Sequence, residues 1–333
     1  MAAATPWDFQ IFQPGTLAEV QQRLAAAVAD GVVAVEAQTV SCGAEISGLD
    51  LSKPLSDRQV EAVRNALLIH KAVFFREQLL DHEQHTEFAS RFGPLTVGHI
   101  SLGHVPDHRE IFALKATGKP ISDPTKPRPP RQLGNPFKGW HTDITAALNP
   151  PAISILRAEA IPSVGGDTCW ANMASAYETL SPTLKAFAEK LRAVHYPAST
   201  WPGPHAEGRA PEALPGEQAI DMITEHPLIT VHPETQERVL NCSPSFLKRI
   251  QGLHPRESEA LLNLLWEHAT RPEHVFRHKW KVGDVVMWDN RGTLHLGPTD
   301  LAEAPRPFQR SMYRTFLYCS FILFSCCFVP FLC

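Results

Sequence analysis

The sequence lacks an excess of either charge. Its 31 lysines and arginines are nearly matched by 35 aspartates and glutamates, and the formal net charge is −4. Such a balance provides no basic surface for nucleic acid or for an anionic membrane. The chain also lacks an internal repeat of roughly 20–50 residues, which excludes solenoids and propellers. We therefore expect a globular protein whose partner is a small molecule.

Cysteines are few in the body of the chain and have no paired spacing. Cys42, Cys169 and Cys242 indicate reduced thiols rather than a disulfide or zinc framework. The first residues, MAAATPWDFQIFQPG, lack the charged and apolar parts of a signal peptide, so we expect a cytoplasmic location. The other four cysteines lie in an atypical apolar tail, residues 319–333. This tail is shorter than the roughly 20 residues of a membrane span, and we assign it no function.

Apolar residues at helical spacing predict helices near the N-terminus, and short apolar runs between turn residues predict strands further on. Helices are expected over 17–28, from Ser56, from Asp81 to Gly93, from Ser181 through Leu191, and through 261–268. Strands are expected at 71–75, 152–158, 228–232, 238–241, 284–289 and 311–317. Together they predict one α+β domain over residues 8–318, with helices packed outside a β-core.

Residues 116–138 are rich in proline, lysine and glycine and have little apolar periodicity. We expect a long loop there. Because it directly precedes the histidine motif described next, it is interpreted as an active-site lid, and the alternative is a surface insertion without a role.

The segment GWHTDIT places His141 and Asp143 two residues apart. On a strand, both side chains would point to the same face. His295 follows a predicted strand and a turn, and it can supply a third ligand. Two histidines and one carboxylate form the facial triad of non-haem Fe(II) oxygenases. Zinc hydrolases can use the same ligands, so the triad alone does not settle the metal.

Two arginines distinguish these possibilities. Arg310 and Arg314 are four residues apart in QRSMYRTFL, so they share one face of a predicted strand. A buried guanidinium binds a carboxylate through two charge-assisted hydrogen bonds, which favours an anchor for a dicarboxylate. The alternative is that both arginines are exposed or paired with acidic residues.

From Ala44 to Phe316 the chain resembles the taurine dioxygenase/alkylsulfatase (TauD/TfdA) family of Fe(II)- and 2-oxoglutarate-dependent dioxygenases. The motifs that carry this resemblance are FFREQ, SRFGPL, WHTDIT, PPA, LRAEAIPSVGGDTCWANM, EHPLITVHPETQERVL, GDVVMWDNRGTLH and QRSMYRT. The resemblance implies a double-stranded β-helix (jelly roll) with flanking helices. It also implies that His141, Asp143 and His295 bind Fe(II).

The resemblance further implies roles for residues around the metal. Arg310 would pair with the distal carboxylate of 2-oxoglutarate, and Thr168 would hydrogen-bond a carboxylate of the same molecule. Arg314 and His99 would contact the substrate. Because the segment between His295 and Arg310 is longer than expected, Arg306 remains an alternative anchor.

The implied reaction belongs to sulfur metabolism. With O₂ and 2-oxoglutarate, the enzyme would hydroxylate a small organic anion, an alkyl sulfate or sulfonate, and form succinate and CO₂. The unstable product would release sulfate or sulfite and an aldehyde. The alternatives are an aryloxyalkanoate or other carboxylate substrate, a zinc-dependent hydrolase, and a non-catalytic 2-oxoglutarate-binding protein. We expect a homo-oligomer, either a dimer or a tetramer, without nucleic acid or membrane partners.

Overall fold

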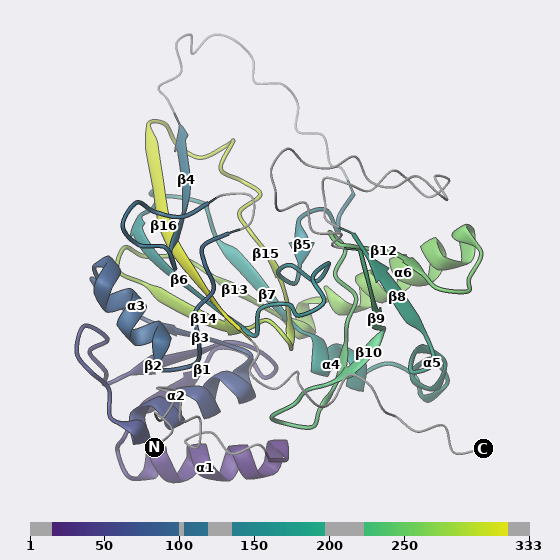
Figure 1. Cartoon of the computed structure of the whole chain (residues 1–333), viewed down its shortest axis with the longest axis horizontal. Helices are drawn as coiled ribbons and strands as arrows, with labels where there is room; N and C mark the ends of the chain where they lie inside the picture. The colour runs from purple at the N-terminus through teal and green to yellow at the C-terminus, as the bar shows by residue number, and fades with distance from the viewer. Residues whose placement is uncertain (1–14, 100–102, 119–134, 197–222, 319–333) are drawn as a thin grey trace, which may run out of the picture.

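Side-chain caps determine where the N-terminal helices begin. Thr16, Ser56 and Asp81 each accept a hydrogen bond from the backbone N–H three residues ahead, and that residue's side chain bonds back to the cap. The computed structural model describes residues 15–99, 103–118, 135–196 and 223–318 (Figure 1). The helices there are α1 (Leu17–Ala29), α2 (Asp57–His70), α3 (His82–Ser90), α4 (Met173–Glu178), α5 (Pro182–Ala188) and α6 (Pro255–Ala269), with a 3-10 turn at Pro272–His274.

Strands make up most of the remaining described structure. They are β1 (Ala34–Ala37), β2 (Ala44–Ser47), β3 (Ala72–Phe75), β4 (Phe112–Gly118), β5 (Trp140–His141), β6 (Ile153–Ala160), β7 (Thr168–Asn172), β8 (Arg192–His195), β9 (Thr224–Pro227), β10 (Ile229–Val231), β11 (Arg238–Leu240), β12 (Leu247–Ile250), β13 (Val275–His278), β14 (Val285–Asp289), β15 (Thr293–Leu296) and β16 (Phe308–Leu317). The largest sheet has the order β1-β2-β3-β14-β6-β16-β4, and a second has the order β13-β7-β15-β5. Smaller sheets are β12-β8-β9 and β10-β11.

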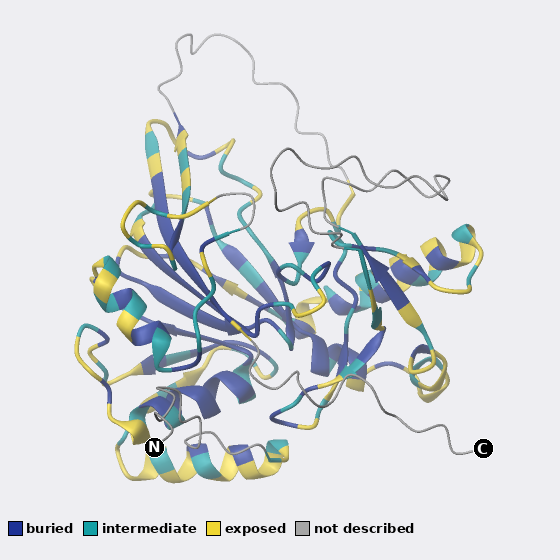
Figure 2. Ribbon diagram, in the orientation of Figure 1, coloured by how far each residue is buried: buried dark blue, intermediate teal, exposed yellow. Residues whose placement is uncertain are grey.

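The two larger sheets share an aromatic core. Strand alternation brings Phe74, Trp288 and Met312 of the seven-stranded sheet together with Trp170 and Phe276 of the four-stranded sheet. The opposite face of the large sheet packs against α2 and α3, and α1 packs on α2 (Figure 1). Helices α4 and α6 cover the outer face of the smaller sheet. Figure 2 shows the resulting buried interior. The predicted jelly roll with flanking helices is confirmed.

The sequence-based elements agree with the structure except at a few boundaries. The helix after Ser181 ends at Ala188, so Leu191 lies outside it. The loop predicted over 116–138 begins too early, because residues 116–118 pair with β16 as part of β4. The proposed lid and the apolar tail fall mainly on 119–134 and on 319–333, outside the described residues. Within the described part of the chain, no helix is long and apolar enough to cross a membrane.

A network of ion pairs centred on Glu234 contacts the turn between β14 and β15. Glu234 accepts from Arg64 Nε at 2.7 Å and from Arg291 Nη1 at 2.7 Å. Arg291 also pairs with Asp289 at 2.7 Å, and His232 lies 3.0 Å from the same carboxylate. Arg64 belongs to α2, so the network ties that helix to the turn that precedes His295. Asp289 also forms the turn itself, because its Oδ1 accepts from the backbone N–H of Arg291.

We predict that Glu234→Ala lowers the free energy of unfolding by about 3–5 kcal/mol, because it leaves the buried Arg64 guanidinium without its carboxylate and removes one of the two carboxylates that pair with Arg291. Urea denaturation at pH 7 measures this loss. The control is Asp30→Ala, which removes an exposed ion pair with Arg58 and should cost about 0–1 kcal/mol. Equal losses in the two variants would contradict the prediction.

The pH dependence of that difference follows from the pKa of Glu234. Burial alone would raise this pKa, but Arg291 and Arg64 outweigh burial and lower it from 4.5 to about 2. A carboxyl whose pKa is lower in the folded state stabilises the fold fully above its unfolded pKa. The stability difference between wild type and Glu234→Ala should therefore shrink as the pH falls from 4.5 towards about 2.

Candidate metal centre

Two histidines lie directly opposite each other on neighbouring antiparallel strands. His141 in β5 pairs in register with His295 in β15, and their ring centroids are 4.0 Å apart. Directly opposed residues place their side chains on the same face of a sheet. His295 is also paired with Trp170 of β7, whose ring belongs to the core between the sheets. Both imidazoles therefore point into the space between the two sheets.

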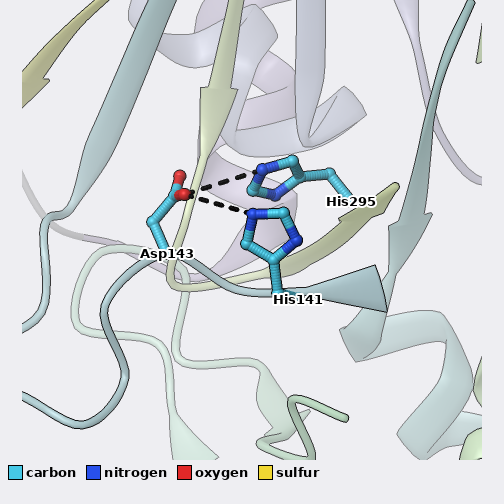
Figure 3. Close-up of side chains that lie close together, drawn as sticks. All are labelled: His141, Asp143 and His295. Carbon is cyan, nitrogen blue, oxygen red and sulfur yellow. Dashed lines mark ion pairs between the residues drawn. The ribbon is translucent and has the colours of Figure 1, made fainter. Parts of the chain in front are cut away.

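Asp143 reaches the two imidazoles from a turn rather than from a strand. Because β5 ends at His141, the expectation that His141 and Asp143 share a strand is wrong. The chain turns at Ile144, whose φ is 51°, a conformation that β-branched residues rarely adopt. Asp143 Oδ1 nevertheless lies 3.6 Å from Nε2 of both His141 and His295 (Figure 3).

The side chain of Asn290 holds this turn in place. Its Oδ1 accepts from the backbone N–H of Asp143 at 2.9 Å, and its Nδ2 donates to the carbonyl oxygens of Asp143 at 3.1 Å and Pro151 at 2.9 Å. Thr142, next to Asp143, donates to the Thr293 carbonyl oxygen at 2.7 Å. These bonds tie the turn to the segment between β14 and β15, and so to His295.

The protonation states at the centre suit metal binding. Burial lowers the pKa of His141 and of His295, so both imidazoles are neutral. His141 Nδ1 donates to the Gly139 carbonyl oxygen at 2.8 Å, which leaves the Nε2 lone pair for a metal. Burial alone would raise the pKa of Asp143, but the charge of Arg314 and the hydrogen bond from Ser154 lower it. The ligands are thus two neutral nitrogens and one carboxylate.

The donor set fits non-haem iron. One ligand atom from each of His141, Asp143 and His295 lies within 4.8 Å of the others. Two imidazoles and one carboxylate form the facial triad and leave positions open for further ligands. Zinc accepts the same donors, so a second feature of the site is needed to separate the two metals.

That feature is a buried arginine on β16. Arg310 is only 6% exposed, and its Nε has no hydrogen-bond partner among the described residues. Burial lowers its pKa to about 10, and within the described part of the chain Asp300 is the one counter-charge that acts on it. Asp300 also accepts from the Gly166 N–H in the turn before Thr168. A buried guanidinium with so little pairing favours an incoming anion. Arg306, by contrast, is exposed and donates to the Ala302 carbonyl oxygen.

Unlike Arg310, Arg314 already pairs with a carboxylate. Its Nη2 donates to Asp143 Oδ2 and, at 3.2 Å, to Ser154 Oγ. Its guanidinium lies over the rings of Trp288 and Phe316, 4.4 Å and 4.6 Å from their centroids. The alternative that an arginine pairs with an acidic residue therefore holds for Arg314, and the residue it pairs with is a candidate metal ligand.

The other two candidate residues lie on opposite sides of the inter-sheet space. Thr168 is buried in β7, where its hydroxyl accepts from Trp280 Nε1 at 3.0 Å. His99 lies beside Phe112 and Phe316, with ring centroids 5.1 Å and 6.2 Å away. Burial, and then the charge of Arg314, lowers the pKa of His99, so the imidazole lies within electrostatic reach of the centre.

Sequence reasoning missed two residues of the site. Asn290 is one of them, and nothing in the sequence showed that its side chain would hold Asp143. Ser154 lies in the apolar run AISILRA. A polar residue within a predicted buried strand was the available signal.

The chain is similar to known proteins in sequence and in structure. The family model described as "Taurine catabolism dioxygenase TauD, TfdA family" matches residues 34–315. An alkylsulfatase of Acinetobacter baylyi is 39% identical over 273 residues, 80% of each chain. An alpha-ketoglutarate-dependent 2,4-dichlorophenoxyacetate dioxygenase of Cupriavidus pinatubonensis is 30% identical over 80% of this chain and 93% of its own. The crystal structure of a taurine dioxygenase from Burkholderia xenovorans matches with a TM-score of 0.72 and 48% identity, over 86% and 89% of the two chains.

We predict that His141→Ala abolishes tight binding of Co(II), a probe for Fe(II), because only two of the three ligands remain. The affinity should fall by more than the roughly 10–100-fold that loss of an outer partner costs. Isothermal titration calorimetry measures the dissociation constant. His254→Ala, which changes the exposed histidine before α6, should bind as wild type does. Unchanged Co(II) binding in His141→Ala would remove His141 from the centre.

Proposed function

The chain belongs to the taurine catabolism dioxygenase TauD, TfdA family, and we propose that it hydroxylates an alkyl sulfate or an alkyl sulfonate. It is an oxidoreductase that uses Fe(II), 2-oxoglutarate (alpha-ketoglutarate) and O₂. The observation that carries the proposal is the facial triad together with a buried arginine that lacks an ion-pair partner. A zinc hydrolase would make no use of that arginine.

His141, Asp143 and His295 would hold the iron. When bound with 2-oxoglutarate and O₂, the iron supplies the oxidising power that hydroxylates a C–H bond, while 2-oxoglutarate loses CO₂ and becomes succinate. The protein contributes placement and the exclusion of water. Trp288 and Phe316, which pack against Arg314, provide apolar walls for this purpose.

Arg310 would anchor the distal carboxylate of 2-oxoglutarate. Its guanidinium is buried, and its Nε has a free donor, so a carboxylate can take two parallel hydrogen bonds from it. Thr168 would bind a carboxylate of the same molecule through its hydroxyl proton, because the oxygen already accepts from Trp280. The exposed position of Arg306 favours Arg310 as the anchor.

The buried charges favour a substrate with one negative charge. The balance counts the fully buried groups and leaves aside Asp300, which is half-buried. Fe(II), Arg310 and Arg314 would contribute four positive charges, and Asp143 and the two carboxylates of 2-oxoglutarate would contribute three negative charges. A monoanion such as an alkyl sulfate would balance this excess, and a buried excess charge is costly. Arg314 would meet the anionic group, and His99 would contact the substrate from the side of Phe112.

The product of such a substrate is unstable. Hydroxylation of the carbon that bears a sulfate ester oxygen gives a hemiacetal-like carbon, which loses sulfate and leaves an aldehyde. A sulfonate hydroxylated on the carbon next to sulfur releases sulfite in the same way. The names of the alkylsulfatase and of the taurine dioxygenase structure support these two classes, and the 2,4-dichlorophenoxyacetate dioxygenase supports the aryloxyalkanoate alternative.

The proposal extends to the organisation of the protein. We propose one catalytic domain over residues 8–318, which the family match over 34–315 supports. We also propose a homo-oligomer, a dimer or a tetramer, that acts in the cytoplasm without nucleic acid. The near balance of charge supports the last point, and the free state of Cys42, Cys169 and Cys242 is compatible with a reducing compartment.

We predict that Arg310→Ala raises the KM for 2-oxoglutarate by at least about tenfold, because charge-assisted hydrogen bonds contribute roughly 1.5–3 kcal/mol. Succinate formation at varied 2-oxoglutarate measures it. Arg306→Ala is the matched control, since it removes an exposed arginine four residues earlier. If Arg306→Ala raises the KM and Arg310→Ala does not, Arg306 is the anchor.

A substrate panel tests the reaction itself. The protein with Fe(II), 2-oxoglutarate and O₂ is given hexyl sulfate, hexanesulfonate, phenoxyacetate or hexanol, and succinate is measured above the rate without substrate. We expect hexyl sulfate or hexanesulfonate to give the highest kcat/KM, and the neutral alcohol to give none. Highest activity on phenoxyacetate would favour the aryloxyalkanoate alternative. Sulfate release without O₂ would favour a hydrolase, and no turnover of any anion would favour a binding protein.

A further inference from the structure

The two oxygens of the Asp143 carboxylate have different surroundings. Oδ1 lies 3.6 Å from Nε2 of each histidine of the triad. Oδ2 points to the other side, where it accepts from Ser154 Oγ at 3.0 Å and from Arg314 Nη2. One oxygen is therefore bound to protein donors, and the other faces the imidazoles.

The direction of the Ser154 hydroxyl bond follows from its partners. Arg314 Nη2 lies 3.2 Å from Ser154 Oγ, and a guanidinium can only donate hydrogen bonds. Ser154 must therefore accept from Arg314 and give its single proton to Asp143. Three hydrogen bonds thus join the three side chains: Arg314 donates to Ser154, and both Arg314 and Ser154 donate to Asp143 Oδ2.

Ser154 is fixed within a sheet, and burial of its hydroxyl costs free energy. Its exposure is 0%, and its backbone lies in the middle of the large sheet, paired with Trp288 of β14 and with Phe316 of β16. The next residues on the same face of β6, Leu156 and Ala158, belong to the apolar core. A hydroxyl among such neighbours costs free energy unless it is hydrogen-bonded.

We propose that Ser154 is a positioning residue that makes Asp143 a one-oxygen metal ligand. Asp143 lies in a turn, where a strand ladder does not restrain it, and Asn290 fixes its backbone but not its carboxylate. Ser154 and Arg314 together hold Oδ2 on the side away from the imidazoles, so Oδ1 alone would face the ion. Without the Ser154 bond a single donor, Arg314, restrains Oδ2, and the carboxylate would be freer to offer both oxygens to the ion.

The test measures binding of Co(II) alone, by calorimetry and by the visible spectrum of the bound ion, in the full-length protein. Ser154→Ala should weaken binding by about 10–100-fold, the usual cost of losing an outer partner, and should change the Co(II) absorption. Ser311→Ala is the matched control, because Ser311 is also buried in the same sheet and donates to a carboxylate, Glu159 Oε2, at 3.1 Å. It should bind Co(II) with the wild-type affinity and spectrum.

Two further variants test whether the hydroxyl itself is responsible and replace the alanine variant if it does not fold. Ser154→Thr retains the hydroxyl and should restore the wild-type spectrum. Ser154→Cys has a similar volume but a weak donor, and it replaces Ser154→Ala if that variant does not fold by circular dichroism. A wild-type affinity and spectrum in the alanine or cysteine variant, or an equal loss in Ser311→Ala, would overturn the assignment.

The inference rests on the proposed metal centre, and the two can fail separately. If wild-type protein binds no Co(II), the proposed centre fails and takes the role of Ser154 with it. If wild type binds Co(II) and Ser154→Ala binds it identically, the centre stands and only the role of Ser154 is refuted.

Discussion

The register of β15 between β5 and β7 determines the geometry of the centre. His295 pairs with His141 on one side and with Trp170 on the other. Because side chains alternate along a strand, a slip of one residue would turn His295 away from the interior and bring Leu294 or Leu296 in its place. The buried network around Glu234 and the Asn290 amide both act at the turn that begins β15. They therefore fix the same register from its start.

Buried arginines serve two different purposes in this fold. Arg64 and Arg291 share Glu234, so their charges are neutralised within the protein and contribute to the assembly of α2 on the sheets. Among the described residues, Arg310 has only the nearby charge of Asp300, and its Nε has no hydrogen-bond partner. Arg314 stands between these cases, since it pairs with a carboxylate that is itself a candidate ligand. The ion pairs that a guanidinium makes within the protein therefore distinguish an arginine that stabilises the fold from one that can bind an anionic ligand.

The sequence predicted the long elements and the ligands because these depend on local pattern. Helix caps such as Ser56 and apolar runs such as 284–289 are local signals, and the histidine and arginine spacings could be recognised without a structure. The short strands β7 and β13 were not predicted, because four or five residues carry too little periodicity. Asp143 was wrongly placed on a strand for the same reason. The roles of Asn290 and Ser154 depend on contacts across 147 and 11 residues of chain, which no local pattern encodes.

The bonds that orient the ligands have a consequence for how the protein acquires its metal. The Gly139 carbonyl, the Asn290 amide and the Ser154 hydroxyl all act on His141 or Asp143. Folding therefore brings the candidate ligands together, and an ion that binds them stabilises the folded chain, because the unfolded chain lacks the site. The stability of the protein then depends on the supply of divalent ions and on their order of affinity.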